Sequence, residues 1–377
     1  MRQAEQAARP IIDFRSNLMM STKLAWGILG TGRIAGIFAR GLAESRTGEL
    51  LAVGSRTQAS ADSFGKEFKV SRRHASYETL LADKDVQVVY ISTPHPMHAE
   101  WAIKAAEAGK HVLCEKPLTL NHAEAMAVVE AARTNDVFLM EAFMYRCHPQ
   151  TAKLVELIRN RVIGDVRLIQ ATFSFHANFD PESRLFNNQL GGGGILDVGC
   201  YCASMARLIA GVALGRDFAE PIEVKGSGHI GEISRVDEYS VASLKFPGGI
   251  IAELSAGVQV NLENVVRIFG TEGSILVPTP WVVSRDGGRS KIFVQRKGER
   301  RLQEVLIKTK EGLYSIEADT VAANLEKRQA FPPAMTWDDT VGNMKTLDLW
   351  RESIGFVYDA EKPKAQVLPV HPPARDS

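Results

Sequence analysis

The side chains with the clearest chemical potential are an amine, a carboxylate and a phenol: Lys116, Asp197 and Tyr201. Lys116 directly follows the run His111–Glu115, so it stands at the C-terminal end of a predicted sheet strand, where open α/β sheets bind ligands. Asp197 and Tyr201 are four residues apart and share one face of a predicted helix, where a carboxylate can orient a group and a phenol can transfer a proton. Each residue alone also fits a structural role, as a strand exit, a helix N-terminal acid or a core tyrosine.

A glycine-rich turn near the start of the chain predicts a dinucleotide site. The apolar run Lys23–Leu29 ends at this turn, and a helical pattern follows it. The turn is Gly30-Thr31-Gly32-Arg33-Ile34-Ala35, with Gly-x-Gly-x-x-Ala spacing. Gly30 permits the tight bend, Gly32 lets a pyrophosphate approach the backbone, and Ala35 allows close packing of helix on strand. We expect the motif to bind a cofactor pyrophosphate at the helix N-terminus.

The end of the next strand predicts which dinucleotide binds. The run Leu50–Val53 is followed by Gly54, Ser55 and Arg56, with no Asp or Glu to bind a ribose 2′-hydroxyl, as NAD sites usually require. A hydroxyl and a guanidinium suit a 2′-phosphate instead. We therefore predict NADP, with NAD the less favoured cofactor. The alternative is that Arg56 is a solvated loop residue stacking on adenine.

Two further strand ends also bear polar side chains. One loop is Thr93-Pro94-His95-Pro96-Met97-His98, and the other is Glu141-Ala142-Phe143-Met144-Tyr145-Arg146. Polar loops that meet at one sheet edge indicate more than packing. His98 is the better candidate of the two histidines, although it is also placed to cap a helix, and we expect His95 to be a solvent-exposed loop residue.

The order of predicted elements defines two domains of different class. Strands and helices alternate over residues 23–145, which predicts an α/β Rossmann-like, doubly wound parallel sheet. Over residues 146–360 the alternation stops, and a run of strands separated by glycine pairs predicts an α+β domain with a large, open, mostly antiparallel sheet. We expect residues 1–22 to form a flexible N-terminal arm and residues 361–377 a C-terminal tail.

Composition and charge argue against several classes of protein. The chain has 45 Lys and Arg against 44 Asp and Glu, so we expect neither nucleic acid nor a membrane as partner. We find no apolar run of the ~18 residues that span a membrane and no secretory signal. The cysteines, Cys114, Cys147, Cys200 and Cys202, lie in apolar contexts without a zinc spacing. They predict reduced thiols, no bound metal and a cytoplasmic location.

Together, these motifs resemble the Gfo/Idh/MocA oxidoreductases. The matching segments, in the family's order, are Gly30 to Ala35, Ser55-Arg56, Thr93-Pro94 with His98, Glu115-Lys116-Pro117, Glu141-Ala142-Phe143, and Gly192-Gly193-Gly194 with Asp197-x-Gly199-x-Tyr201. Inositol dehydrogenase-type members have His at the Tyr201 position. Tyrosine there is similar to glucose-fructose oxidoreductase, the dimeric dihydrodiol dehydrogenases and the xylose dehydrogenases.

The resemblance implies an NADP(H)-dependent dehydrogenase or reductase that acts on a secondary alcohol or lactol carbon of a sugar or cyclic diol. Lys116 would be the catalytic lysine, Asp197 would fix a neighbouring hydroxyl, and the charge of Lys116 would lower the pKa of Tyr201 from about 10. Thr93, Pro94, His98, Glu115 and Lys116 would contact the cofactor, and Arg184, His176 and Arg146 would line the substrate pocket. The resemblance also implies a homodimer or homotetramer formed through the C-terminal sheet.

Two other functions are compatible with the same motifs. One is a redox-assisted lyase or glycosidase that oxidises and restores its cofactor in each turnover. The other is a non-catalytic dinucleotide-binding sensor, against which the joint presence of Lys116, Asp197 and Tyr201 argues. Which of Lys116 and Tyr201 transfers the proton stays open at this stage.

Overall fold

The computed structural model describes residues 23–362. The predicted N-terminal arm, residues 1–22, and residues 363–377 of the predicted tail lie outside the described residues.

The first sheet is parallel and six-stranded, in the order β3-β2-β1-β4-β5-β6. Its strands are β1 (Leu24–Leu29), β2 (Gly48–Gly54), β3 (Arg72–His74), β4 (Val88–Ile91), β5 (His111–Glu115) and β6 (Leu139–Ala142). The helices that connect them are α1 (Arg33–Ala43), α2 (Gln58–Glu67), α3 (Tyr77–Leu81), α4 (His98–Glu107) and α5 (His122–Thr134). The strand order reverses between β1 and β4, which is the ligand-binding switch point of such sheets. The predicted doubly wound sheet is confirmed.

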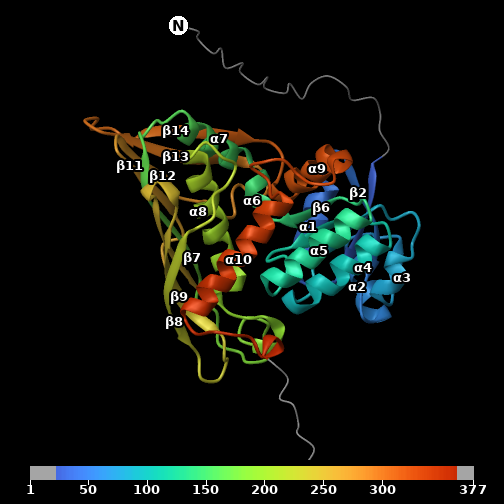
Figure 1. The fold of residues 1–377 in the computed structure, drawn as a ribbon. Helices are drawn as coiled ribbons and strands as arrows, with labels where there is room; N and C mark the ends of the chain where they lie inside the picture. Colours follow the sequence, from blue (N-terminus) through green and yellow to red (C-terminus); the bar gives the residue numbers. More distant parts are fainter. Residues whose placement is uncertain (1–22, 363–377) are drawn as a thin grey trace, which may run out of the picture.

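The second sheet has eight strands, in the order β14-β13-β12-β11-β7-β10-β9-β8. They are β7 (Val166–Ser174), β8 (Glu223–Ile230), β9 (Asp237–Lys245), β10 (Ile251–Gly257), β11 (Val266–Gly270), β12 (Gly273–Val277), β13 (Gly288–Arg296) and β14 (Gln303–Thr309). Only the β7–β10 pair is parallel, so the predicted mostly antiparallel sheet is confirmed. One face packs against α7 (Pro149–Arg159) and α8 (Cys200–Ala213), while the opposite face has no helix over it in Figure 1.

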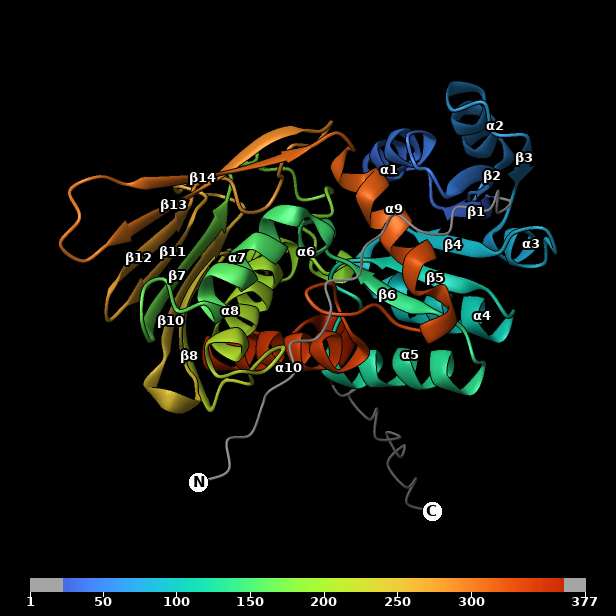
Figure 2. The same cartoon turned by 90° about the horizontal axis from the view of Figure 1, so that it is seen from above.

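The last two long helices join the two domains. Helix α9 (Leu313–Asn324) packs against α1 and against the short α6 (Met144–Cys147), and α10 (Trp337–Ser353) packs against α5, α8 and β8. Figure 2 shows both helices in the region where the two sheets approach each other. The chain therefore returns to the first domain after it has built the second sheet.

Helix α8 is the apolar core helix of the second domain. The stretch Asn188–Ala213 has a mean hydropathy of 1.5 over one 18-residue window, so by length and composition alone it could cross a membrane. That window is 100% buried inside the fold. Its apolar character is explained by α8 packing against β7 on one side and α10 on the other.

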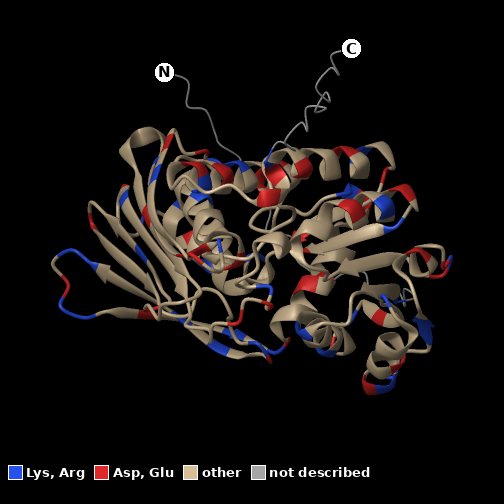
Figure 3. Ribbon diagram, turned by 90° about the horizontal axis from the view of Figure 1, so that it is seen from below, with Lys and Arg blue, Asp and Glu red and all other residues tan. Residues whose placement is uncertain are grey.

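Charged side chains are interspersed over both domains, and the tip of the β13–β14 hairpin is a basic projection (Figure 3). The four cysteines are free, and burial raises the pKa of each thiol. The reduced state of these thiols stays a prediction.

Candidate active site

The turn between β1 and α1 fits a dinucleotide pyrophosphate. Gly30 has a φ of +106°, and a Cβ there would stand 2.9 Å from Ser92 Oγ, so glycine is required. A Cβ on Gly32 would meet no atom within 4 Å, which leaves open space beside the backbone. Gly32 caps α1 without a side-chain hydrogen bond, so the first N–H groups of the helix are open to an anion. Thr31, Arg33 and Ile34 complete the turn and are all partly or fully exposed.

The end of β2 presents hydroxyl and guanidinium groups. Ser55 is buried, and its Oγ lies 3.2 Å from Thr31 Oγ1, which links it to the glycine turn. Arg56 is exposed and makes no hydrogen bond or ion pair within residues 23–362. Thr57 caps the N-terminus of α2, accepting a hydrogen bond from Ser60 N. A free guanidinium beside a helix N-terminus is an arrangement that favours a phosphate.

Lys116 and Asp197 come together from the two domains. Lys116 Nζ donates a hydrogen bond to the backbone oxygen of Asp197 at 2.7 Å and lies 3.6 Å from its Oδ1. Arg184 Nη1 contacts the same Oδ1 at 2.9 Å. One carboxylate therefore faces two cations, and one of these cations is the lysine at the end of β5.

Asp197 lies in a π-helix, Ile195–Gly199, that precedes α8. The ordinary helical turn predicted for this segment is thus corrected to a wider one. Single π-turns occur frequently at functional sites. Here the turn directs the carbonyl of Asp197 at Lys116.

The Asp197 carboxylate is ionised. Burial alone would raise its pKa, but Arg184 and then Lys116 outweigh burial and hold the pKa well below its usual value. His95, by contrast, has a pKa well below 6.5, because burial and then Arg184 disfavour its charged form. A fixed carboxylate between two donors is suited to hold Lys116 in place and to accept a hydrogen bond from a substrate hydroxyl.

Glu115 holds the backbone of the loop that contains Lys116. Its Oε1 accepts a hydrogen bond from the Tyr90 hydroxyl at 2.5 Å, and its Oε2 accepts one from Lys116 N at 3.3 Å. Burial raises its pKa, opposed by Lys116 and Tyr90. The predicted cofactor contact of Glu115 stays a prediction, beside this supporting role.

Tyr201 is buried next to Lys116. Lys116 Nζ lies over its ring, 5.1 Å from the centroid, and the hydroxyl donates to Met144 Sδ at 3.5 Å. The predicted lowering of its pKa is wrong: burial, and then Glu115, raise the pKa well above 10. The loss of water outweighs the charge of Lys116, so the phenol is protonated and is a donor.

The two histidines of the loop after β4 do not lie where the sequence predicted. His98 is 0% exposed, and its two ring nitrogens lie 2.8 and 2.9 Å from the backbone oxygens of Thr93 and Pro117. The predicted cofactor contact of His98 is therefore wrong, because the ring is enclosed and ties two loops together. His95 is also buried rather than exposed, with Nδ1 2.9 Å from Gly191 O, because the glycine-rich loop of the second domain covers it. Thr93 and Pro94 remain at the sheet edge.

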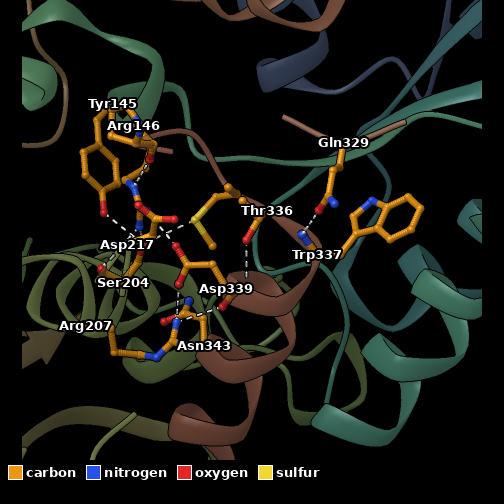
Figure 4. A network of polar contacts seen from close by, with 12 residues as sticks. Tyr145, Arg146, Ser204, Arg207, Asp217, Gln329, Thr336, Trp337, Asp339 and Asn343 are labelled. Carbon is orange, nitrogen blue, oxygen red and sulfur yellow. Dashed lines mark hydrogen bonds and ion pairs between the residues drawn. The ribbon is translucent and has the colours of Figure 1, made fainter. Parts of the chain in front are cut away.

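The predicted role of Arg146 in the substrate pocket is wrong. Its side chain is 1% exposed and pairs with Asp339 at 2.6 Å and with Ser204 Oγ at 2.7 Å. Arg207 contacts the same carboxylate at 2.5 Å, which completes a buried network (Figure 4). His176 is exposed, with Nδ1 3.1 Å from Gln259 O, and no hydrogen bond joins it to Lys116 or Asp197 in the described part of the chain.

Three buried residues near the site were not predicted as functional. Glu141 was noted as part of a polar loop and of a segment matching the family, but without a role. Asp237 has no sequence signal, and Tyr314 lies on α9, far along the chain. Burial and then the charge of nearby Glu115 raise the pKa of Tyr314, and Arg33 opposes this shift. Long-range folding is what brings all three to the site.

Comparison with known proteins establishes the family. Residues 24–143 match the model described as an oxidoreductase family with an NAD-binding Rossmann fold, and residues 151–276 match the GFO/IDH/MocA C-terminal domain. The chain belongs to the Gfo/Idh/MocA oxidoreductase family. The resemblance predicted from the motifs is thereby confirmed.

Several relatives align over nearly their full length. A trans-1,2-dihydrobenzene-1,2-diol dehydrogenase of Xenopus laevis is 32% identical, covering 90% of this chain and 100% of the relative. A D-xylose 1-dehydrogenase (NADP(+)) 2 of Haloferax volcanii is 30% identical, covering 88% and 97%. The crystal structure of an aldose-aldose oxidoreductase from Caulobacter crescentus, complexed with glycerol, superimposes with a TM-score of 0.77 at 26% identity, covering 88% and 98%.

Proposed function

We propose that the protein is an NADP(H)-dependent oxidoreductase that acts on a secondary alcohol or lactol carbon of a sugar or cyclic diol. The observation that supports this most directly is the Lys116 amine, held at 2.7 Å from Asp197 O at the C-terminal end of β5. The family fold, the open N-terminus of α1 and the acid-free end of β2 support the cofactor.

Each site residue has a defined task in this proposal. When bound, NADP would supply the hydride acceptor for oxidation of the alcohol carbon, and NADPH would supply the hydride donor for the reverse reduction. Lys116 hydrogen-bonds the reacting oxygen and stabilises its negative charge, while Asp197 fixes the lysine and a neighbouring hydroxyl. Tyr201, protonated as its raised pKa requires, donates a hydrogen bond and supplies a proton in the reduction direction.

The choice of NADP is supported by both chemistry and relatives. Ser55 and Arg56 replace the acid of an NAD site, and the Haloferax volcanii relative is named as NADP-dependent. Glycine turn residues 30–34, together with Thr93, Pro94 and Glu115, are the proposed contacts for the rest of the cofactor. Arg184, next to Asp197, and more weakly His176, are proposed to line the substrate side.

The substrate class follows from the relatives, which are named for a cyclic diol, an aldose sugar and an aldose pair. The test is a panel of aldoses, polyols, anhydro-sugars and cyclic diols with NADP, followed by NADPH absorbance. We expect NADPH to form in step with product. Product without net NADPH would indicate the lyase or glycosidase activity, and NADP binding without turnover on any substrate would indicate a sensor.

We further propose a homodimer or homotetramer formed through the uncovered face of the eight-stranded sheet. Exposed apolar side chains on this sheet are Tyr239, Val241, Ile251, Phe269 and Leu306. Exposed apolar side chains on an uncovered sheet face favour association. Light scattering of Val241→Lys should then show a smaller particle than the parent. The free, buried thiols support a reducing, cytoplasmic compartment, which fractionation of the source cells tests.

A further inference from the structure

Two buried carboxylates lie behind the Lys116–Asp197 contact, one in each domain. Glu141, on β6, accepts a hydrogen bond from the backbone N–H of Leu118 at 2.8 Å. Asp237, the first residue of β9, accepts one from the backbone N–H of Ile195 at 2.6 Å. Leu118 stands two residues after Lys116, and Ile195 stands two residues before Asp197. Each carboxylate therefore holds the segment that bears one member of the contact.

The position of Glu141 follows from the sheet. Strand β6 is the neighbour of β5, with Glu141 opposite Cys114, so its side chain reaches the loop that follows β5. Leu118 is 0% exposed, and its N–H needs a partner inside the protein because water cannot supply one. A carboxylate oxygen on the adjacent strand supplies it and fixes the backbone just after Lys116.

Asp237 fixes the opposite half in the same way. It is 0% exposed, and it bonds the first residue of the π-helix. Gly193 has a φ of +106°, and a Cβ there would stand 2.2 Å from Asp237 Oδ1, so the glycine run packs directly on the carboxyl. The Tyr358 hydroxyl holds Gly192 O at 2.5 Å, also within the glycine run. The start of the π-helix is thus fixed at two points.

We propose that Glu141 and Asp237 are positioning residues that set the distance between the Lys116 amine and the Asp197 carbonyl. Neither has a role in contacting substrate or cofactor. The proposal rests on the proposed function, since it takes Lys116 as the group at the reacting oxygen. A lysine side chain is flexible, so its place depends on the two backbone segments at either end of the contact. A displacement of about 1 Å in a catalytic group costs on the order of 10²-fold in rate.

The kinetic test compares Glu141→Ala and Asp237→Ala with the amide variants Glu141→Gln and Asp237→Asn, which keep an acceptor oxygen. We expect the alanine variants to lose about 10²-fold in kcat with an unchanged Kd for NADP. The amide variants should recover most of that loss. If Asp237→Ala does not fold, Asp237→Ser takes its place, because the shorter side chain moves the acceptor oxygen away from Ile195 N.

The control for simple destabilisation is Leu244→Ala, a core truncation on β9, the same strand as Asp237. It should lower the melting temperature and leave kcat within about twofold of the parent. A double variant provides a second criterion: in a Lys116→Ala background, Asp237→Ala should reduce kcat no further, because both act through one contact. The proposal would be overturned if the alanine variants had the kcat of Leu244→Ala. It would also be overturned if the losses in kcat of Lys116→Ala and Asp237→Ala were additive in the double variant.

A readout without turnover separates this proposal from the proposed function. Lys116 can be acylated by an amine reagent and followed by mass spectrometry, because its side chain is 13% exposed. Its reaction should be faster in both alanine variants, where the amine is no longer held at Asp197 O, and unchanged in Leu244→Ala. If no substrate of the panel is turned over but acylation of Lys116 is faster in both alanine variants, only the proposed function is refuted. Equal acylation rates in all variants refute the positioning role.

Discussion

The replacement Lys116→Met tests the centre of the proposed mechanism, because it removes the amine and keeps an unbranched side chain. Asp197 keeps Arg184 Nη1 at 2.9 Å, so no buried carboxylate is left without a cation. The stability cost should therefore be about 1.5–3 kcal/mol, that of one hydrogen bond to a charged group. It should stay below the ~3–5 kcal/mol lost when a buried pair is left with one member.

The effect on turnover should be far larger than the effect on stability. One preorganised donor at the reacting oxygen contributes about 2.7–4 kcal/mol, or ~10²–10³ in kcat. We therefore expect kcat to fall by at least about 10²-fold, while the Kd for NADP changes little because the proposed phosphate contacts lie at α1 and β2.

The assay is NADPH absorbance at saturating substrate, combined with NADP titration by tryptophan fluorescence and a melting curve. Lys104→Met is the matched control, since this lysine pairs with Glu100 on the surface of α4. The control should keep the kcat of the parent. A folded Lys116→Met that binds NADP and retains kcat within about tenfold would refute the assignment of Lys116.

Three further outcomes follow from the structure. Arg56→Ala should raise the Kd for NADP about 10–100-fold, because a charge-assisted hydrogen bond to phosphate is lost. The Kd for NAD should be nearly unchanged. Equal shifts of the two Kd values in a titration would contradict the 2′-phosphate contact. Burial raises the pKa of Glu141 from 4.5 to about 7, so the folded chain binds this proton more tightly than the unfolded chain does. The stability that this proton contributes is therefore present below pH 4.5 and is lost as the pH rises from 4.5 to about 7. Glu141→Gln should flatten melting temperature against pH there, and an unchanged slope would contradict the raised pKa. Arg146→Met should cost about 1.5–3 kcal/mol in denaturant unfolding, the loss of a hydrogen bond to a charged group, because Asp339 keeps Arg207 as its second buried cation. KM should be unaltered at temperatures where the variant is folded. A raised KM without a loss of stability would restore Arg146 to the substrate pocket.

Local chemistry was what the sequence determined by itself. The glycine turn at residues 30–35 needs only a strand before it and a helix after it, so its spacing was sufficient to predict the pyrophosphate site. The absence of an acid after β2 was likewise visible in a few residues. Lys116 could be placed at the sheet edge because the carboxyl ends of parallel strands meet there.

Only the tertiary structure decided which polar side chains are enclosed and by what. Arg146 and His98 are as polar as Arg56. Yet the first two are buried against partners 193 and 19 residues away, whereas Arg56 is exposed. The pKa of Tyr201 rises because burial outweighs one nearby cation, and this balance depends on the whole surrounding core. Glu141 and Asp237 belong to the same class: their backbone partners are 23 and 42 residues away, and no local pattern encodes such contacts. Sequence spacing determines how residues within one turn or strand lie relative to one another. Desolvation and long-range hydrogen bonds, by contrast, exist only once the chain has folded.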